Sequence, residues 1–180
     1  EHRALLHELI KGQVKVSCAL SEAGGGTDVA RAMRTSARRV PGGGWILDGQ
    51  KTWTSGALAA DWIVVLARTR SIERSPIDGI SMFLTPRKAP GVEVRDIPTL
   101  GIHGMSTCEV FLDGVALPED ALLGQADRGM RQVFATVNRE GLNAAAACLG
   151  VGRGALDATL SYVRQREVFG KPIGAFQVPQ

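Results

Sequence analysis

Cysteine, aromatic residues and long apolar runs are all scarce in this 180-residue chain. The three cysteines, Cys18, Cys108 and Cys148, are far apart and odd in number, so they indicate neither a metal site nor a disulfide framework. No apolar run approaches the roughly 20 residues that span a bilayer, and the first residues lack the apolar core of a signal peptide. We therefore expect no metal, no membrane span, a reducing compartment and, by default, a cytoplasmic location.

A strong charge of either sign is also missing, since the formal net charge is +3. A single tyrosine and dispersed basic residues argue against a nucleic-acid surface. The slight basic excess would favour an anionic ligand such as a phosphorylated cofactor, but scattered arginines on a solvated face are the more ordinary explanation. The 44% hydrophobic content is typical of a globular protein and is sufficient for a sizeable core.

Short apolar and β-branched segments, separated by turn residues, fill the first two thirds of the chain. They predict strands at 14–20, 33–39, 45–48, 51–55, 62–69, 79–85, 91–97 and 106–113. Pro41 and the three glycines after it predict a hairpin turn, and Asp48-Gly49 predicts a second turn. Closely spaced strands of this kind indicate a small antiparallel barrel or sandwich.

A helical pattern follows from about residue 128 to 164, where apolar residues recur three, four or seven apart. Such a helix would be about 55 Å long. Its interior glycines at 141, 150, 152 and 154 each cost about 1 kcal/mol relative to alanine, so we expect close helix packing or a local break. The fold class is therefore α+β, a β domain followed by a long helix that begins a helical bundle.

Both ends of the chain look like parts of other elements. Residues 4–10 read as the tail of an amphipathic helix, and residues 176–180 as the start of another. We expect a piece of a larger protein, divided into a helical tail at 1–12, a central β domain at 13–122 and the start of a helical domain at 123–180.

Two segments carry residues suited to a flat, polar-edged ligand with phosphates. Residues 20–28 (LSEAGGGTD) contain glycines, which let a backbone approach a ligand closely. Ser21, Thr27 and Ser55 offer hydroxyls, and Trp53 offers a flat apolar wall. These properties favour a flavin nucleotide. There is no strand-linked GxGxxG fingerprint and no Gly-Lys-Ser/Thr of a P-loop, which argues against the common nucleotide folds.

The order of four segments resembles the acyl-CoA dehydrogenase family of flavoproteins. Residues 20–28 are similar to its TEPxAGSD loop, and residues 48–55 (DGQKTWTS) to its NGxKxWIT strand. Arg139 in 137–139 (VNR) resembles the arginine of its first C-terminal helix. Residues 166–173 (REVFGKPI) with Gln177 resemble its RxxFGxPI…Q segment. Ala23 in place of proline, Thr54 in place of isoleucine and Phe176 before Gln177 depart from the pattern and leave the subfamily open.

The resemblance implies FAD as cofactor and α,β-dehydrogenation of an acyl-CoA thioester. In that reaction a glutamate outside these 180 residues takes the α-proton, and hydride passes to flavin N5. It also implies an electron-transfer flavoprotein or similar acceptor as partner, and a homodimer or homotetramer in which one subunit completes its neighbour's cofactor site.

The implied site residues follow from the same motifs. The cofactor would contact Cys18, Leu20, Ser21, Gly26, Thr27, Trp53, Thr54, Ser55, Arg166, Phe169 and Gln177. The substrate would contact Thr27, Asn138 and Arg139, with Arg139 favouring the ionised form of the missing carboxylate. No catalytic residue is expected in this chain itself.

Other interpretations remain open at this point. A flavin oxidase or monooxygenase could use the same fold, and a non-catalytic assembly module would need no cofactor. Taken singly, Trp53 and Cys18 fit a buried core, Arg139 a buried ion pair, and His103 an ordinary loop position.

Overall fold

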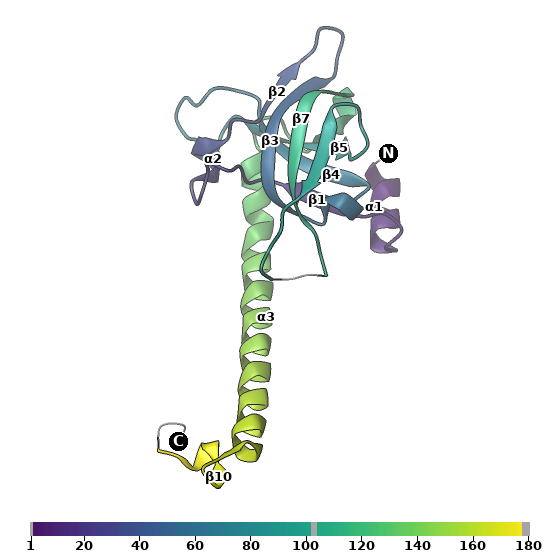
Figure 1. Cartoon of the computed structure of the whole chain (residues 1–180). Helices are drawn as coiled ribbons and strands as arrows, with labels where there is room; N and C mark the ends of the chain where they lie inside the picture. Colours follow the sequence, from purple (N-terminus) through teal and green to yellow (C-terminus); the bar gives the residue numbers. More distant parts are fainter. Residues whose placement is uncertain (1, 102–103, 178–180) are drawn as a thin grey trace. The chain divides into compact units, whose positions relative to one another are not determined.

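The computed structural model describes residues 2–101 and 104–177 (Figure 1). The chain divides into two compact units, residues 1–133 and 134–180. The first contains helices α1 (His2–Ile10) and α2 (Val29–Ala32), the 3-10 helices η1 (Ala57–Ala59) and η2 (Glu119–Ala121), and eight strands. These strands are β1 (Val16–Ala19), β2 (Ser36–Arg39), β3 (Trp45–Ser55), β4 (Trp62–Arg68), β5 (Ile80–Pro86), β6 (Val92–Asp96), β7 (Thr107–Leu117) and β8 (Leu122–Leu123).

The strands form one mostly antiparallel sheet in the order β6-β7-β3-β2-β4-β5-β8, and β1 pairs in parallel with β4. The antiparallel β fold is confirmed, as is the hairpin of β2 and β3 across the Pro41 turn. The sheet is not closed into a barrel, however. β6 and β8 stand at its two ends, and β8, with two residues, is too short to complete a ring.

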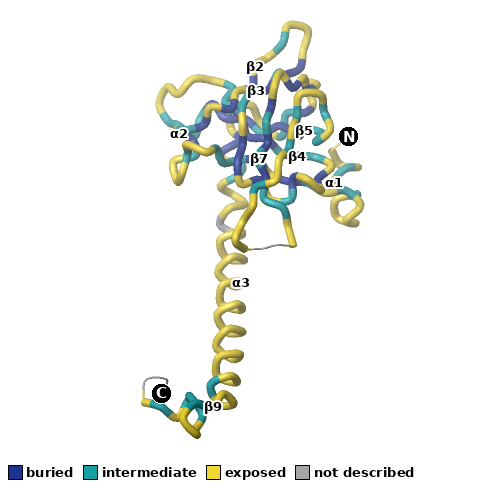
Figure 2. Tube along the Cα trace, viewed as in Figure 1, coloured by how far each residue is buried: buried dark blue, intermediate teal, exposed yellow. Residues whose placement is uncertain are grey.

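Buried residues gather along the strands of this unit (Figure 2). Their apolar side chains form two groups, which hold the unit together. The larger lies on the sheet and includes Leu47, Val65 and Val110, all with no exposed surface, and an edge-on contact of Trp45 with Phe83. The smaller joins Ala30 and Met33 near α2 to Leu66, Ile80 and Met130. Burying each large apolar side chain stabilises the fold by about 1.5–3 kcal/mol. Because successive side chains of a strand point to opposite faces, alternating apolar residues determine which face of the sheet is buried.

β3 runs through the Asp48-Gly49 position at which a turn was expected, so that prediction is wrong. The pairing of β3 with β7 shifts register between Leu47 and Gly49 instead. Gly49 has φ +148°, and a Cβ there would lie 2.6 Å from the Cα of Thr35. Glycine at this position therefore permits a close approach of two backbones rather than a reversal of the chain.

The predicted long helix is confirmed as α3 (Gly129–Gln165), which begins in the first unit and runs into the second. It continues unbroken through its glycines, and a Cβ at Gly141, Gly150, Gly152 or Gly154 would meet no described atom within 4 Å. The described side chains from Phe134 to Tyr162 are exposed. The local break is therefore excluded, and nothing among the described residues packs closely against these glycines.

After α3 the second unit ends in a short hairpin of β9 (Glu167–Val168) and β10 (Lys171–Pro172), followed by the 3-10 helix η3 (Ile173–Ala175). The backbone N–H of Ile173 donates to the carbonyl of Arg166 at 2.8 Å and closes this turn. Within the described ranges, no helix combines the length and apolarity that a bilayer crossing needs.

Candidate functional site

The glycine-rich loop leaves the end of β1 and leads into α2. Ser21 and Glu22 are half-buried, whereas Gly24, Gly26 and Thr27 are exposed. The N–H of Gly25 donates to the carbonyl of Glu22 at 2.9 Å, and Asp28 caps α2 by accepting from the N–H of Arg31. Beside the loop is a hollow of about 490 Å³ lined by Glu22, Ala23, Gly24, Arg31, Ala32, Met33, Arg34 and Gln50.

A buried ion pair joins this loop to β3. The Nζ of Lys51 donates to Oε1 of Glu22 at 2.8 Å and to the carbonyl of Leu20 at 3.2 Å. The Lys51 side chain is completely buried and that of Glu22 is only 10% exposed. Glu22 also accepts from the backbone N–H groups of Arg34, at 2.7 Å, and Thr35, at 3.0 Å. One carboxylate thereby connects three separate stretches of chain.

Burial and pairing act in opposite directions on these two groups. Burial lowers the pKa of Lys51, and the charge of Glu22 and its hydrogen bond offset part of that effect. Burial alone would raise the pKa of Glu22, but the Lys51 charge and the hydrogen bonds from Lys51, Thr35 and Arg34 together lower it below its ordinary value. The carboxylate is therefore ionised at neutral pH and holds the ammonium beside it.

Trp53 lies on a β-bulge next to this pair. The pairing of β3 with β7 shifts register between Lys51 and Thr54, and the N–H of Thr52 donates to the carbonyl of Ser21 at 2.9 Å. Trp53 has φ +58°, and its side chain is 61% exposed. A left-handed backbone costs a bulky residue about 1–2 kcal/mol. Strain of this kind at an exposed aromatic residue on a strand bulge is a pointer to function.

Several predicted cofactor residues are brought together here. Leu20 and Ser21 meet β3 through Lys51 and Thr52, and the hydroxyl of Ser17 on β1 donates to the carbonyl of Ser55 at 2.6 Å. Gly26, with φ +48°, and Thr27 lie further along the same loop. Trp53 and Cys18 are exposed, so their interpretation as buried core residues is wrong.

Thr54 does not present its hydroxyl to this surface, contrary to the expectation that it lies near the cofactor. Its side chain is 1% exposed and points into the unit. Only its backbone could contribute to a site at the surface. The bulge explains the difference, because one extra residue reverses which side chains face inward along the rest of a strand.

The Thr54 hydroxyl has no hydrogen-bond partner among the described residues. Thr54→Val is therefore expected to raise the free energy of unfolding by about 1 kcal/mol, because it removes a buried, unsatisfied polar atom at nearly constant volume. Urea unfolding measures the change. Thr35→Val is the matched control: Thr35 is also buried, but its hydroxyl lies 3.4 Å from the carbonyl of Gln50 and donates to it, so this variant should lose stability. Stabilisation by both substitutions, or by neither, would contradict the explanation.

The remaining predicted residues belong to the second unit. Arg139 is exposed on α3, so it is not the buried ion pair considered as an alternative, and nothing is described of the Asn138 side chain. Arg166 and Gln177 are exposed as well. Phe169 has φ +53° and is 93% exposed. Trp53 and Phe169 are thus two aromatic residues held outward on left-handed backbone. His103 lies outside the described residues.

The sequence interpretation missed Glu22 as the partner of Lys51. The signal was present in part, since a lysine between strand residues needs a counter-charge if it is buried. What the sequence did not show is that Lys51 is on the inner face and that a glutamate 29 positions earlier reaches it.

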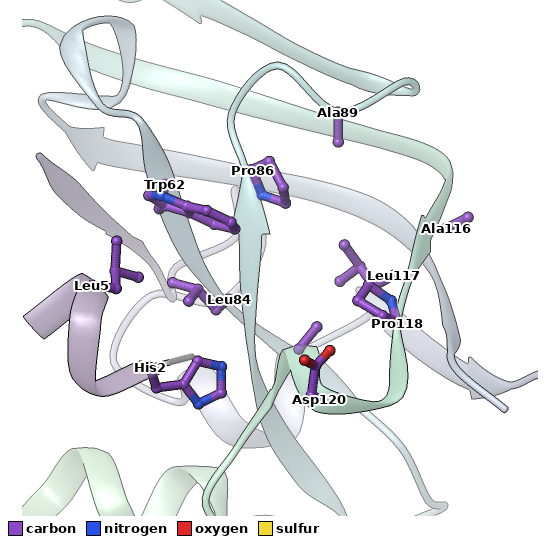
Figure 3. A pocket seen from close by; sticks show the side chains of 11 residues that line it. His2, Leu5, Trp62, Leu84, Pro86, Ala89, Ala116, Leu117, Pro118 and Asp120 are labelled. Carbon is purple, nitrogen blue, oxygen red and sulfur yellow. The ribbon is translucent and has the colours of Figure 1, made fainter. Parts of the chain in front are cut away.

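A second, apolar hollow of about 270 Å³ lies elsewhere on the first unit (Figure 3). Leu5 of α1 faces Trp62 of β4 and Leu84 of β5 across it, and Pro118, between β7 and η2, also lines it. None of the predicted cofactor or substrate residues lines it, so we assign it no part in the site.

Comparison with known proteins agrees with the motifs. Residues 17–115 match the family model of the acyl-CoA dehydrogenase middle domain, and residues 127–180 match that of the C-terminal domain. The chain therefore belongs to the acyl-CoA dehydrogenase family. Glutaryl-CoA dehydrogenase of Desulfococcus multivorans is 38% identical over 89% of this chain and 41% of its own length. The human mitochondrial short-chain specific acyl-CoA dehydrogenase is 35% identical over 92% of this chain and 40% of its own length.

Solved structures give the same result. A glutaryl-CoA dehydrogenase from Mycobacterium smegmatis in complex with FADH2 superposes with a TM-score of 0.87 and 34% identity, over 99% of this chain and 44% of that one. A structure described as an electron transferring flavoprotein of Acidaminococcus fermentans gives 0.85 and 30%, over 96% of this chain and 45% of that one. The chain spans about two fifths of the length of these curated relatives.

Proposed function

We propose that this chain is part of an FAD-dependent dehydrogenase that introduces an α,β double bond into an acyl-CoA thioester. Family membership supports the reaction class. The observation that carries the proposal is the junction of the glycine-rich loop with β3, where Ser21 is bonded to the bulge that turns Trp53 outward. An exposed indole beside a glycine-rich, hydroxyl-bearing loop suits a flat ring system with a phosphate tail.

The described residues fit this cofactor. Ser21, Thr27 and Ser55 offer hydroxyls at or near the surface, and Cβ atoms at Gly24 and Gly26 would meet nothing within 4 Å, so the loop backbone is open to a ligand. We assign the ring to Leu20, Ser21, Trp53 and Ser55, and the phosphates to Gly26 and Thr27. Cys18 stays a peripheral candidate, and Thr54 takes part through its backbone alone.

The chemistry divides between the cofactor and the protein. FAD, when bound, supplies the acceptor for the hydride that leaves the β-carbon. The protein's part is to orient the thioester and to stabilise negative charge as the α-proton leaves. We assign Thr27, Asn138 and Arg139 to the substrate. The Arg139 charge would keep the proton-accepting carboxylate ionised, and that carboxylate is a glutamate outside these 180 residues.

The assembly and its partners are part of the same proposal. We assign Arg166, Phe169 and Gln177 to the cofactor of a neighbouring subunit in a homodimer or homotetramer, which gives the outward Phe169 a surface to cover. We also propose reoxidation by an electron-transfer flavoprotein or a similar acceptor. The proposal keeps the division into a helical tail at 1–12, a β domain at 13–122 and the start of a helical domain at 123–180. Cytoplasmic location is proposed from the free thiols of Cys108 and Cys148, although several curated relatives are mitochondrial.

The test of the activity uses the full-length protein loaded with FAD. Anaerobic addition of butyryl-, isovaleryl- or glutaryl-CoA should bleach the flavin absorbance with at least one substrate, and an artificial electron acceptor should restore it. Direct reoxidation by oxygen at a comparable rate would indicate an oxidase instead. Absence of bound flavin would favour an assembly module and reject the proposal.

Arg166→Ala is expected to lower flavin content and oligomer stability together. The substitution removes an exposed guanidinium, and with it the contact that we assign to the neighbouring subunit. Flavin-to-protein absorbance ratios and size-exclusion chromatography measure the two effects. Arg164→Ala, which removes another exposed arginine in the last turn of α3, is the matched control and should change neither quantity. Retention of both in Arg166→Ala would argue against a shared site.

A further inference from the structure

Lys51 is unusual because, although it is charged, it is among the largest fully buried side chains in the described part of the molecule. Lysine is almost never completely buried unless it is paired. Taking two charges out of water is costly, and an apolar pair of similar volume often gives equal or higher stability. Stability alone therefore does not explain why a lysine and a glutamate occupy these two positions.

The geometry of the pair suggests what it accomplishes. The ammonium of Lys51 on β3 binds the loop at two points, the Leu20 carbonyl and the Glu22 carboxylate. The same carboxylate accepts from the backbone of Arg34 and Thr35, just before β2. The loop is thus bound both to β3 and to the segment before β2. Its distance from β3 is set by the lengths of the Lys51 and Glu22 side chains.

Trp53 is two residues beyond Lys51, on the bulge in which the N–H of Thr52 donates to Ser21. A shift of residues 20–22 would weaken this hydrogen bond and release the bulge. The strained left-handed backbone of Trp53 would then relax, since such strain persists only where the surroundings enforce it. The position of the Trp53 indole therefore depends on the bulge, and the bulge depends on the ion pair.

We infer that the Lys51–Glu22 pair is a positioning device, which fixes the Ser21 segment relative to the Trp53 indole so that both can contact one flat ligand. This inference rests on the proposed function, because the ligand is taken to be FAD. Neither Lys51 nor Glu22 is assigned a contact with the cofactor. Their effect is exerted through Ser21 and Trp53.

The experiment replaces the pair by a neutral one, Lys51→Met with Glu22→Gln, in the full-length protein. Glutamine keeps an acceptor for Arg34 or Thr35, and neither charge is left alone in the interior. A second variant, Glu22→Asp, keeps both charges but shortens the connection by one methylene. The control is Arg95→Met with Glu93→Gln, which removes an ion pair on β6, in the same unit, whose two side chains are each 58% exposed.

Both variants should fold, by circular dichroism and cooperative thermal unfolding, and should bind FAD at least about tenfold more weakly than the wild type. The absorption maxima and visible circular dichroism of the residual bound flavin should shift, a change that loss of stability alone would not produce. The control should match the wild type. A folded variant with affinity within about twofold of the wild type, and an unshifted spectrum, overturns the inference.

The remaining outcomes are also decisive. Failure of both variants to fold would show that the pair is needed by the whole domain, which overturns the narrower positioning role. Absence of FAD binding by the wild type would reject the proposed function itself. Binding by the wild type and unchanged binding by the variants would reject only the role of the pair.

Discussion

Gly49→Ala is expected to lower the free energy of unfolding by about 3 kcal/mol, through backbone strain and overpacking together. The added Cβ would lie 2.6 Å from both the Cα and the Oγ1 of Thr35. Thr35 cannot retreat, because its N–H is held by Glu22 at 3.0 Å and its carbonyl accepts from the N–H of Arg68 at 2.8 Å. Urea unfolding followed by circular dichroism measures the loss.

Gly43→Ala separates the two contributions to that loss. Gly43 also has a positive φ, +103°, but a Cβ there would meet nothing within 4 Å. This control should therefore lose only the conformational part, about 1 kcal/mol. Equal losses in the two variants would show that contact with Thr35 is unimportant.

Trp53→Gly should leave the stability of the FAD-free protein within about 0.5 kcal/mol of the wild type and weaken FAD binding about thirtyfold. Glycine relieves the left-handed strain of about 1–2 kcal/mol, while greater freedom of the unfolded chain and lost contacts offset most of the gain. Covering about 80 Å² of indole by a ligand contributes about 2 kcal/mol, which corresponds to the expected loss of affinity.

Fluorescence titration of FAD measures the affinity, and thermal unfolding without FAD measures the stability. Trp53→Phe retains an aromatic face on the same strained backbone and should bind within about threefold of the wild type. Unchanged affinity in Trp53→Gly would remove the indole from the site and, with it, the observation on which the proposed function depends most.

Sequence patterns predicted the elements that depend on local periodicity. The strands, the hairpin at Pro41 and the helix α3 followed from alternation, turn residues and helical spacing, and the structure confirms them. The expected strand at 33–39 is shorter, because residues 33–35 precede β2 and serve instead as an anchor for Glu22. Family motifs located the glycine-rich loop and β3.

The errors share one physical origin, contacts between residues far apart in the chain. Asp48-Gly49 was interpreted as a turn because the neighbouring sequence does not show that Thr35 packs against Gly49. Strict alternation would bury Trp53 with Lys51, but the bulge between Lys51 and Thr54 places Thr54 inside and Trp53 outside. Whether the sheet closes into a barrel depends on which strands pair at its two edges. No single segment of the sequence determines that pairing.

The parallel pairing of β1 with β4 has a consequence for how the protein acquires its structure. β1 pairs with β4, and Val16 lies opposite Trp62. β1 therefore cannot join the sheet until the chain through β2, β3 and β4 has been synthesised and β4 has returned beside β1. Non-local pairings of this kind form slowly, because the connecting chain must first be ordered. The glycine-rich loop, which follows the end of β1, therefore cannot become ordered during synthesis before β4 has been made. Destabilising changes in β4, remote from any ligand, should then delay the appearance of a binding-competent protein.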